Sequence, residues 1–551
     1  MRKTKGITLI ALVITIIILL ILSGISISAL TNQGLFKNAK LAKEKAEKEQ
    51  KKETSLLDQY ESELNKYIEN GRWDGKVNKP ELMTGMSAIK FTEPTDSAEG
   101  TTVDTSSSDK EWYNYENKKW ANAKTEDGSM WVWIPRYAYR IHKENGVETQ
   151  KFDVVFLVGL TDTYYDENGK LQTAQRQTSE DQTIVTNGDT YTVHPAFTNE
   201  SSINYANGGW DVELAGIWVA KFEAGYASGN NSATVKASSV NYSQDTAYVP
   251  AVETGTTTKT ATARNWLDGE YGSTTTAIKY PTFQGLTYSM NYINHNDVYR
   301  ISKVLTESGN IYGLSSNSTD SHLMKNSEWG AVSYLSQSKY GLDGTNIVIN
   351  SVYLNNTTKS VYAVTGCASS TADASAVSTT IGALNNRTQS SVYVWTQKNG
   401  TAASSTGTIY GIYDMAGGIS ERTSSLINNK NDNLKTYGSQ IIADLNNGKS
   451  TKYITIYPTG ETLGQTMAQA SQANYTNNTK IYGDAIKETS TLGTGTNSWY
   501  SDCSDFVGLS TPFLLHGGYY GGTSISGCFA FGRTSGNGSY NRGFRSVLVS
   551  L

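Results

Sequence analysis

Cysteine and histidine, the residue types most often used as nucleophiles and metal ligands, are few and scattered in this sequence. The five histidines show neither an HExxH motif nor a paired ligand spacing, which indicates structural roles. Three cysteines are too few for a disulfide framework and lack zinc-finger spacing. Cys503 and Cys528 are the one pair close in sequence, so a single bridge between them stays open. No Ser-His-Asp motif, nucleophile elbow or P-loop supplies another chemistry.

Tyrosine and glycine dominate the composition instead, with 35 Tyr and 50 Gly against 8 Pro. Tyrosine offers a large rigid surface with a polar tip, which favours a binding face. The alternative is that the tyrosines fill strand positions of a β-rich domain. Charged residues make up 18% of the chain and the net charge is -4, so we expect no nucleic-acid partner.

Residues 7–30 form an uncharged, largely apolar run of 24 residues, which is long enough to cross a bilayer as a helix. The segment before this run is basic, and basic flanks stay on the cytoplasmic side. We therefore expect a transmembrane helix over 7–30 that anchors the rest of the chain at the cell surface. The small, Ser-rich end of the run at 23–29 keeps open a cleaved secretory signal peptide.

The sequence KGITLI at 5–10 resembles the start of a type IV prepilin. In that family a dedicated peptidase cuts after the glycine, and the helix stays in the membrane until the subunit enters a filament. The resemblance implies a leader of residues 1–6 cut between Gly6 and Ile7, with a prepilin peptidase and other pilin subunits as partners. The family usually has Phe at the position of Ile7 and Glu at that of Ala11, and these departures leave open a permanently anchored, minor or tip subunit.

Residues 31–70 are charged and predict an amphipathic helix. Their apolar stripe has helical spacing and consists of Leu56, Leu57, Tyr60, Leu64 and Tyr67. We expect this helix to extend the pilin-like anchor and raise the head; a solvated spacer is the alternative. The polar residues 71–125 predict a linker or a small β extension.

Residues 126–551 are long enough for one large domain. Runs that are apolar on both faces predict buried strands at 130–135 and 216–223. Helices are predicted at 286–293 and 328–336. The Ser/Thr/Asn-rich segments 229–277 and 351–408 predict surface insertions.

Six segments of this part, taken in chain order, resemble the formylglycine-generating-enzyme family, whose fold is an elaborated C-type-lectin type. They are WVWIP at 131–135, WVAKFE at 218–223, NSEW at 326–329, GIYDMAGGISE at 411–421, GG at 517–518 and GFR at 543–545. The resemblance implies an α+β fold, in which a transmembrane or pilin-like helix precedes a C-type-lectin-like domain with irregular insertions.

The family's oxygen-dependent enzymes hold copper through two cysteines. These cysteines follow shortly after the glycine pair that corresponds to Gly517 and Gly518 here. Here only Cys528 lies near that turn, and it has no near partner. Because soft Cu(I) needs thiolate ligands, we expect no copper oxidase chemistry and predict that the chain is not an enzyme. A divergent enzyme of this family is the alternative.

Some family members bind calcium in the turn of the fourth segment. The matching positions here are Asp414, Gly417, Ile419 and Glu421, which would supply two carboxylates and two carbonyls. Hard oxygen ligands of this kind suit Ca²⁺. The alternative is that Asp414 caps the turn while Glu421 pairs with Arg422 or another base.

The C-terminus resembles the variable region of proteins that a retroelement diversifies, which share this lectin-like fold. In them a constant frame surrounds residues encoded by codons with randomised adenines. The frame residues here are Gly517, Gly518, Tyr520, Gly527, Phe529, Ala530, Phe531, Arg533, Gly543, Phe544 and Arg545. The implied variable, ligand-binding residues within 517–545 are Tyr519, Gly521, Gly522, Ser524, Gly532, Ser535, Asn537, Gly538, Ser539, Tyr540 and Asn541.

Codon chemistry agrees with this division. All of the variable residues can be reached from AAC or AAT by changing adenines, whereas Lys, Gln, Glu, Trp and Met cannot. None of those five types occurs from Ser501 to the end, although their absence also extends upstream of the region. An ordinary Gly/Tyr/Ser/Asn-rich lectin loop is the alternative.

These features together predict a membrane- or pilus-anchored adhesin or receptor that binds an external protein or glycan through its C-terminal residues. A structural pseudopilin of a secretion or uptake machine is the alternative. The small head usual for that class does not account for the large part of the chain after residue 125.

Overall fold

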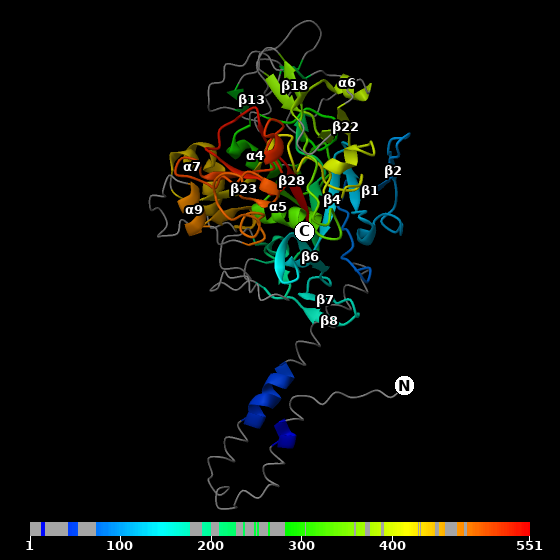
Figure 1. Cartoon of the computed structure of the whole chain (residues 1–551), viewed down its shortest axis with the longest axis vertical. Helices are drawn as coiled ribbons and strands as arrows, with labels where there is room; N and C mark the ends of the chain where they lie inside the picture. The colour runs from blue at the N-terminus through cyan, green and yellow to red at the C-terminus, as the bar shows by residue number, and fades with distance from the viewer. Residues whose placement is uncertain are drawn as a thin grey trace, which may run out of the picture. The chain divides into compact units, whose positions relative to one another are not determined.

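The computed structural model describes residues 13–16, 42–52, 73–176, 190–199, 209–226, 235–236, 247–248, 251–252, 263–264, 281–291, 293–303, 305–356, 360–369, 375–386, 391–427, 429, 431–446, 451–457, 471–478 and 482–551. The chain divides into two compact units, Met1–Glu69 and Asn70–Leu551. The larger unit is a mixed α+β structure with more strand than helix (Figure 1).

In the first unit, residues 13–16 and 42–52 are helical. Lys43 and Glu47 face one another one turn apart on the second helix, 3.8 Å from Nζ to Oε1. Most of the predicted segments 7–30 and 31–70 lies outside the described residues, as do Gly6 and Ile7.

Within the described segments, no helix combines the length and the apolar character that crossing a bilayer requires.

A seven-stranded antiparallel sheet forms the centre of the second unit. Its order is β17-β28-β10-β4-β3-β1-β2, with bounds Thr319–Leu323, Ser546–Ser550, Gly216–Ala220, Met130–Pro135, Asn122–Thr125, Met86–Phe91 and Thr102–Asp104. The strands predicted at 130–135 and 216–223 are confirmed as β4 and β10, although β10 ends at Ala220. Trp133 and Trp218 are paired across these two strands and both are buried.

Residues predicted as a linker or small β extension also belong to this sheet. Strands β1, β2 and β3 all fall within 71–125, and β3 pairs directly with β4. The predicted domain boundary at 126 thus falls between two paired strands. The sequence did not indicate this pairing, because hydrogen bonds between strands leave no local trace in composition.

A second sheet of five strands carries the C-terminal region. Its order is β24-β23-β25-β26, with β27 also paired to β23, and the bounds are Thr455–Tyr457, Ser420–Ile427, Phe513–His516, Phe531–Thr534 and Arg542–Phe544. The chain then crosses to the first sheet, where β28 lies between β10 and β17. The consecutive strands β27 and β28 therefore belong to different sheets.

Smaller elements surround these sheets. The remaining strands are β5 (Tyr137–Glu144), β6 (Val147–Phe156), β7 (Thr163–Tyr165), β8 (Leu171–Thr173), β9 (Thr192–Val193), β11 (Gly225–Tyr226), β12 (Val235–Lys236), β13 (Ala247–Tyr248), β14 (Ala251–Val252), β15 (Ala263–Arg264), β16 (Pro281–Thr282), β18 (Val352–Asn356), β19 (Ser360–Ala363), β20 (Cys367–Ser369), β21 (Val377–Ser378) and β22 (Val392–Val394). The α-helices of this unit are α4 (His295–Lys303), α5 (Asn326–Ser336), α6 (Ile381–Asn385), α7 (Asp432–Tyr437), α8 (Ser439–Asn446) and α9 (Ser471–Asn478).

Helix α5 links the core to the C-terminal region. The helix predicted at 328–336 is confirmed and begins two residues earlier, because the Glu328 side chain accepts from the Lys325 backbone N–H at 2.8 Å. Its Trp329 stacks on His516 of β25 and donates from Nε1 to the carbonyl of Cys528 at 2.8 Å.

The helix predicted at 286–293 is wrong. Leu286 has a φ of +60°, a left-handed conformation that a helix cannot include. The N–H groups of Leu286, Ser289 and Met290 donate to distant carbonyls rather than to one another.

The prediction of a surface insertion at 351–408 is wrong in part. Val352, Cys367 and Ala403 are buried in the core. Val352 lies on β18, Cys367 on β20 and Ala403 at the end of a 3-10 helix, Gly400–Ala403. All three pack inward although the flanking Ser/Thr/Asn sequence carries little hydrophobic signal. The other predicted insertion, 229–277, lies almost wholly outside the described residues.

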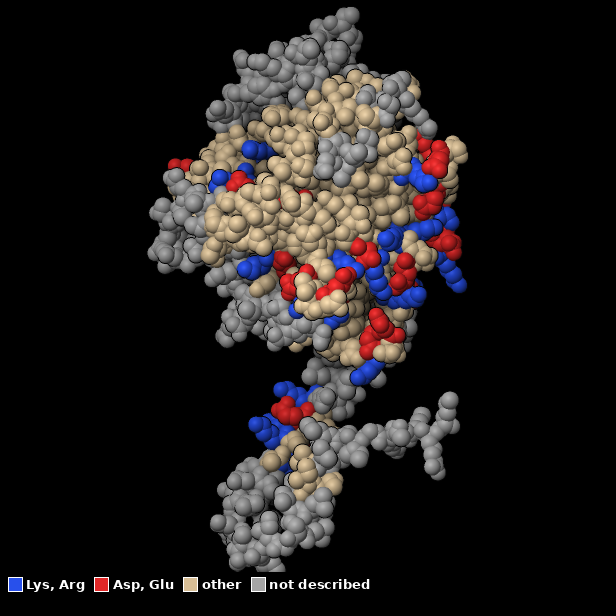
Figure 2. All heavy atoms as spheres, in the orientation of Figure 1, with Lys and Arg blue, Asp and Glu red and all other residues tan. Residues whose placement is uncertain are grey.

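Charged side chains are unevenly distributed on the visible face of this unit. Figure 2 shows most of them along the right and lower parts of this face, a smaller group at the left, and a broad uncharged area over the centre. This distribution fits the low charge content of the sequence.

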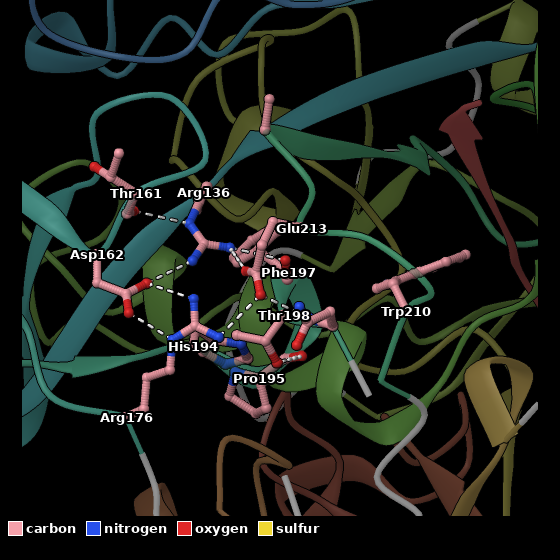
Figure 3. A network of polar contacts seen from close by, with 12 residues as sticks. Arg136, Thr161, Asp162, Arg176, His194, Pro195, Phe197, Thr198, Trp210 and Glu213 are labelled. Atoms are coloured by element: carbon pink, nitrogen blue, oxygen red, sulfur yellow. Dashed lines mark hydrogen bonds and ion pairs between the residues drawn. The ribbon is translucent and has the colours of Figure 1, made fainter. Parts of the chain in front are cut away.

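A buried ion-pair network anchors the chain that follows β4 (Figure 3). The Arg136 guanidinium has no exposed surface and contacts Asp162 at 2.8 Å and Glu213 at 2.6 Å. Its Nη1 and Nε also donate to backbone carbonyls of Phe197 and Thr161. Arg176 contacts the same two carboxylates from the other side. The buried charge of Arg136 is thus fully compensated.

Candidate ligand-binding face

Two connections in the five-stranded sheet carry the residues that the sequence assigns to ligand binding. Residues 517–530 join β25 to β26, and residues 535–541 join β26 to β27. We call these two connections, with Gly532 of β26, the C-terminal face.

Burial separates the predicted variable residues from the predicted frame. Gly521, Ser524 and Tyr540 are exposed, and the other variable residues are partly exposed, namely Tyr519, Gly522, Gly532, Ser535, Asn537, Gly538, Ser539 and Asn541. The buried frame residues are Gly517, Tyr520, Gly527, Phe529, Ala530, Phe531, Gly543, Phe544 and Arg545. Gly518 and Arg533 are partly exposed.

Glycines and one serine shape the first connection. Gly517 and Gly518 have φ values of +83° and +71°. Residues other than glycine adopt this backbone conformation only at a cost in free energy. Beyond them the Ser526 hydroxyl both accepts from the Tyr519 N–H at 3.1 Å and donates to the Tyr519 carbonyl at 3.0 Å. The conformation of the turn is therefore stabilised by its backbone and by Ser526, and does not depend on the exposed side chains of this connection.

The second connection is held by short polar contacts. Gly536 has a φ of +101°, and its carbonyl accepts from the N–H of His295 at 2.8 Å. Ser535 donates to the Asn537 side chain at 3.0 Å, and Ser539 donates to that of Asn541 at 2.7 Å.

Tyrosines gather on the first connection and beside it. Tyr519 lies edge-on to Tyr520, with 5.4 Å between ring centroids, and Tyr520 stacks on Tyr353 of β18 at 4.5 Å. Burial and the neighbouring Tyr540 raise the pKa of Tyr519. Sequence reasoning missed Tyr353, because it lies in a stretch that was predicted as a surface insertion.

Gly532 differs from the frame glycines Gly527 and Gly543 in the space around it, whereas a Cβ at the face glycines Gly521 or Gly522 would meet a neighbouring side chain at 2.7 or 2.4 Å. A Cβ at Gly527 would overlap the carboxylate of Asp502, and one at Gly543 would overlap Ile419. A Cβ at Gly532 would meet nothing within 4 Å. The frame glycines therefore permit close packing, whereas Gly532 leaves room for a side chain.

We predict that Gly532→Ser changes the free energy of unfolding by less than about 0.5 kcal/mol, as is usual for surface substitutions. Gly527→Ala should cost about 1–3 kcal/mol, because the added methyl group overpacks against Asp502. Denaturant unfolding of both variants measures this. Equal losses of stability would contradict the division between frame and face.

The four residues implied as calcium ligands lie together beneath the C-terminal face. Glu421 accepts from Nε of Arg545 at 2.7 Å and also contacts Nη2 of that residue. Asp414, with a φ of +62°, accepts from the Asn350 amide and the Gly366 N–H, both at 2.9 Å. Protein donors thus occupy both carboxylates.

At the two backbone positions of that set, the N–H groups donate to other residues, whereas the carbonyl oxygens are the atoms that the resemblance assigns to calcium. The N–H of Gly417 donates to the Gly517 carbonyl at 3.0 Å, and that of Ile419 donates to Glu223 at 3.1 Å. Burial raises the pKa of Glu223 well above its usual range, and the nearby Asp414 and Glu421 add to this. In the described part of the chain, no group of three or more His, Cys, Asp or Glu residues is arranged to hold a metal ion.

The three cysteines are free thiols, so Cys503 and Cys528 form no bridge in this structure. Cys528 is buried, and burial raises the pKa of its thiol well above the usual range. Burial also raises the pKa of Cys503, to about 11.

Sequence comparison identifies neither a matching family nor a matching curated protein. No protein-family model matches the chain, and no curated protein matches it significantly.

Proposed function

We propose that this chain is a membrane- or pilus-anchored surface protein of C-type-lectin-like fold that binds an external protein or glycan through the C-terminal face. The division of burial within 517–545 is the observation that carries the proposal. Residues assigned to binding keep exposed surface, while the aromatic and glycine residues around them pack into the body of the domain.

The chemistry of the exposed residues supports the same proposal. Tyr, Ser, Gly and Asn are the residue types that binding loops favour, because they give adaptable contacts at low entropic cost. A rigid sheet beneath variable loops is also how proteins combine stability with changeable specificity. The retroelement resemblance remains part of this proposal, and its test is the neighbouring DNA, which should hold a reverse-transcriptase gene and a near-copy of the final codons.

Binding should depend on Tyr519 and Tyr540, since interface energy concentrates in a few aromatic or Arg contacts. We predict that Tyr540→Ala and Tyr519→Ala each weaken ligand binding by more than about 1 kcal/mol while changing stability little. The measurement is adhesion of cells that display each variant to their target surface, followed by titration with the ligand recovered from it.

Tyr165→Ala is the matched control, because that tyrosine is exposed on β7 and lies outside the C-terminal face. Undiminished binding by both face variants, or an equal loss in the control, would contradict the proposed site.

Processing at the prepilin-like junction tests the proposed anchor separately. We expect N-terminal sequencing of surface-extracted protein to read Ile7 first. A start beyond Ala29 would instead indicate a cleaved secretory signal peptide.

A further inference from the structure

Three of the arginines that the structure describes in the second unit are fully buried, and two of these three have carboxylate partners. Arg136 contacts Asp162 and Glu213, and Arg545 contacts Glu421. The third, Arg422 of β23, forms no ion pair with any residue that the structure describes. A buried charge without a partner is costly, so Arg422 calls for an explanation.

The hydrogen bonds of Arg422 are also incomplete. Its Nη2 donates to the carbonyl of Asn537, but its buried Nε and Nη1 have no partner among the residues that the structure describes. By contrast, every nitrogen of the Arg545 guanidinium donates to an acceptor, including the carbonyls of Ala220 and Tyr413 at 3.0 and 2.9 Å. The Nε and Nη1 atoms of Arg422 are therefore hydrogen-bond donors without an acceptor among the described residues.

A second guanidinium lies close to the first. Arg542 of β27 donates from Nη1 to the Asn537 side chain at 2.9 Å, so Asn537 bridges the two arginines through its side chain and its carbonyl. Register places both arginines at one end of the sheet, because Ser420 pairs with Arg542 and Arg422 pairs with Phe544. Arg542 keeps part of its surface exposed, which gives access from solvent.

The electrostatics agree with this geometry. Burial and the charge of Arg542 lower the pKa of Arg422 well below its usual range. His295, which stacks on Phe513, has both ring nitrogens buried without a partner, and burial and Arg422 lower its pKa. Among the described residues, no carboxylate forms an ion pair with Arg422 or Arg542.

We propose that Arg422 and Arg542 form an oxyanion site under residues 535–541 that takes the carboxylate of an acidic side chain from a protein ligand. Paired guanidiniums match the geometry of a carboxylate and bind it with strong, charge-assisted hydrogen bonds. A protein source is favoured because Ser535, Asn537 and Tyr540 above the site are uncharged residues of the kind found in protein-binding loops. The origin of the carboxylate rests on the proposed function, but the site itself does not.

The test uses the full chain in a mild detergent, titrated with acetate against chloride at constant ionic strength. We expect a saturable rise in the unfolding temperature with acetate. Arg542→Gln should weaken the apparent affinity about tenfold or more, the effect of losing one charge-assisted contact. Arg533→Gln is the matched control, because that arginine lies on neighbouring β26 and already pairs with Asp505 at 3.1 Å.

Arg422→Met removes the buried guanidinium and replaces it with an apolar chain of similar length, so it should fold and lose the acetate response. Absence of any acetate effect beyond that of chloride, or an unchanged response in both Arg422→Met and Arg542→Gln, would overturn the site. N-acetylglutamate amide and methyl glucuronide distinguish the sources, and markedly tighter binding of the sugar acid would overturn the protein source. None of these readouts needs the natural ligand, so failure of the oxyanion site and failure of the binding face can be told apart.

Discussion

Phe529→Ala and Phe531→Ala should each lower the free energy of unfolding by about 3–5 kcal/mol, the range for removing a buried aromatic ring. Phe529 has no exposed surface and lies edge-on to Trp499, with 5.1 Å between ring centroids. Phe531 is 1% exposed and packs in a separate cluster with Phe506 and Leu514. Each truncation would therefore leave a cavity in a different part of the second unit.

Urea unfolding of the two variants beside Tyr540→Ala measures this difference. Tyr540 is 37% exposed, so its truncation should change stability by no more than about 0.5 kcal/mol. If the tyrosine variant unfolds early while the phenylalanine variants stay stable, the frame and the face have been assigned the wrong way round.

Asp502→Asn should change how stability depends on pH. Asp502 is fully buried under the frame, where one carboxylate oxygen accepts from the Phe529 N–H at 3.1 Å and the other has no partner. Burial raises its pKa to about 8. Between the unfolded pKa, about 4, and this value, the folded state holds a proton that the unfolded state has lost.

The sign follows from that difference in bound protons. Stability falls as pH rises through this window, by about 1.4 kcal/mol for each pH unit, and levels off above the folded pKa. The stability of the wild type relative to Asp502→Asn should therefore drop by about 3 kcal/mol between pH 5 and pH 7. Asparagine keeps an acceptor for the Phe529 N–H, so the comparison isolates the charge.

Unfolding free energies of the two proteins at pH 5, 6 and 7 provide the measurement. A parallel pH dependence of the two proteins would show that Asp502 ionises freely in the folded state. Asp505→Asn serves as the control, because it removes a partly exposed carboxylate from the same segment. If that variant flattens the curve equally, burial of Asp502 is not the cause.

Local patterns predicted the elements that a single segment determines. Apolar runs predicted β4 and β10, and the apolar face of 328–336 predicted α5. The same reasoning failed at 286–293, because the left-handed φ of Leu286 and the pairing of its neighbours with distant strands leave no mark on hydrophobic spacing. Most glycine and aromatic residues of the frame in 517–545 are buried, because tight turns and core packing restrict residue type strongly.

Contacts between distant segments could not be predicted from the sequence. Nothing near Asp502 in the chain indicates that Gly527 leaves room for its carboxylate. Likewise, Glu421 and Arg422 are neighbours in sequence, but Glu421 pairs with Arg545 while Arg422 has no carboxylate. The sequence left open whether Glu421 pairs with Arg422 or another base, and only the fold identifies that base.

Strand β28 has a consequence for how this protein is made. The strand occupies an interior place between β10 and β17, yet it is encoded after every residue of the C-terminal face. The large sheet therefore cannot close until β28, and with it every residue of the C-terminal face, has been synthesised. A frameshift or premature stop among the preceding codons would remove β28 and leave a gap at an interior position of the sheet. Copies damaged in this way would lack an interior strand of the sheet, so the architecture makes folding depend on an intact reading frame through the exposed loops.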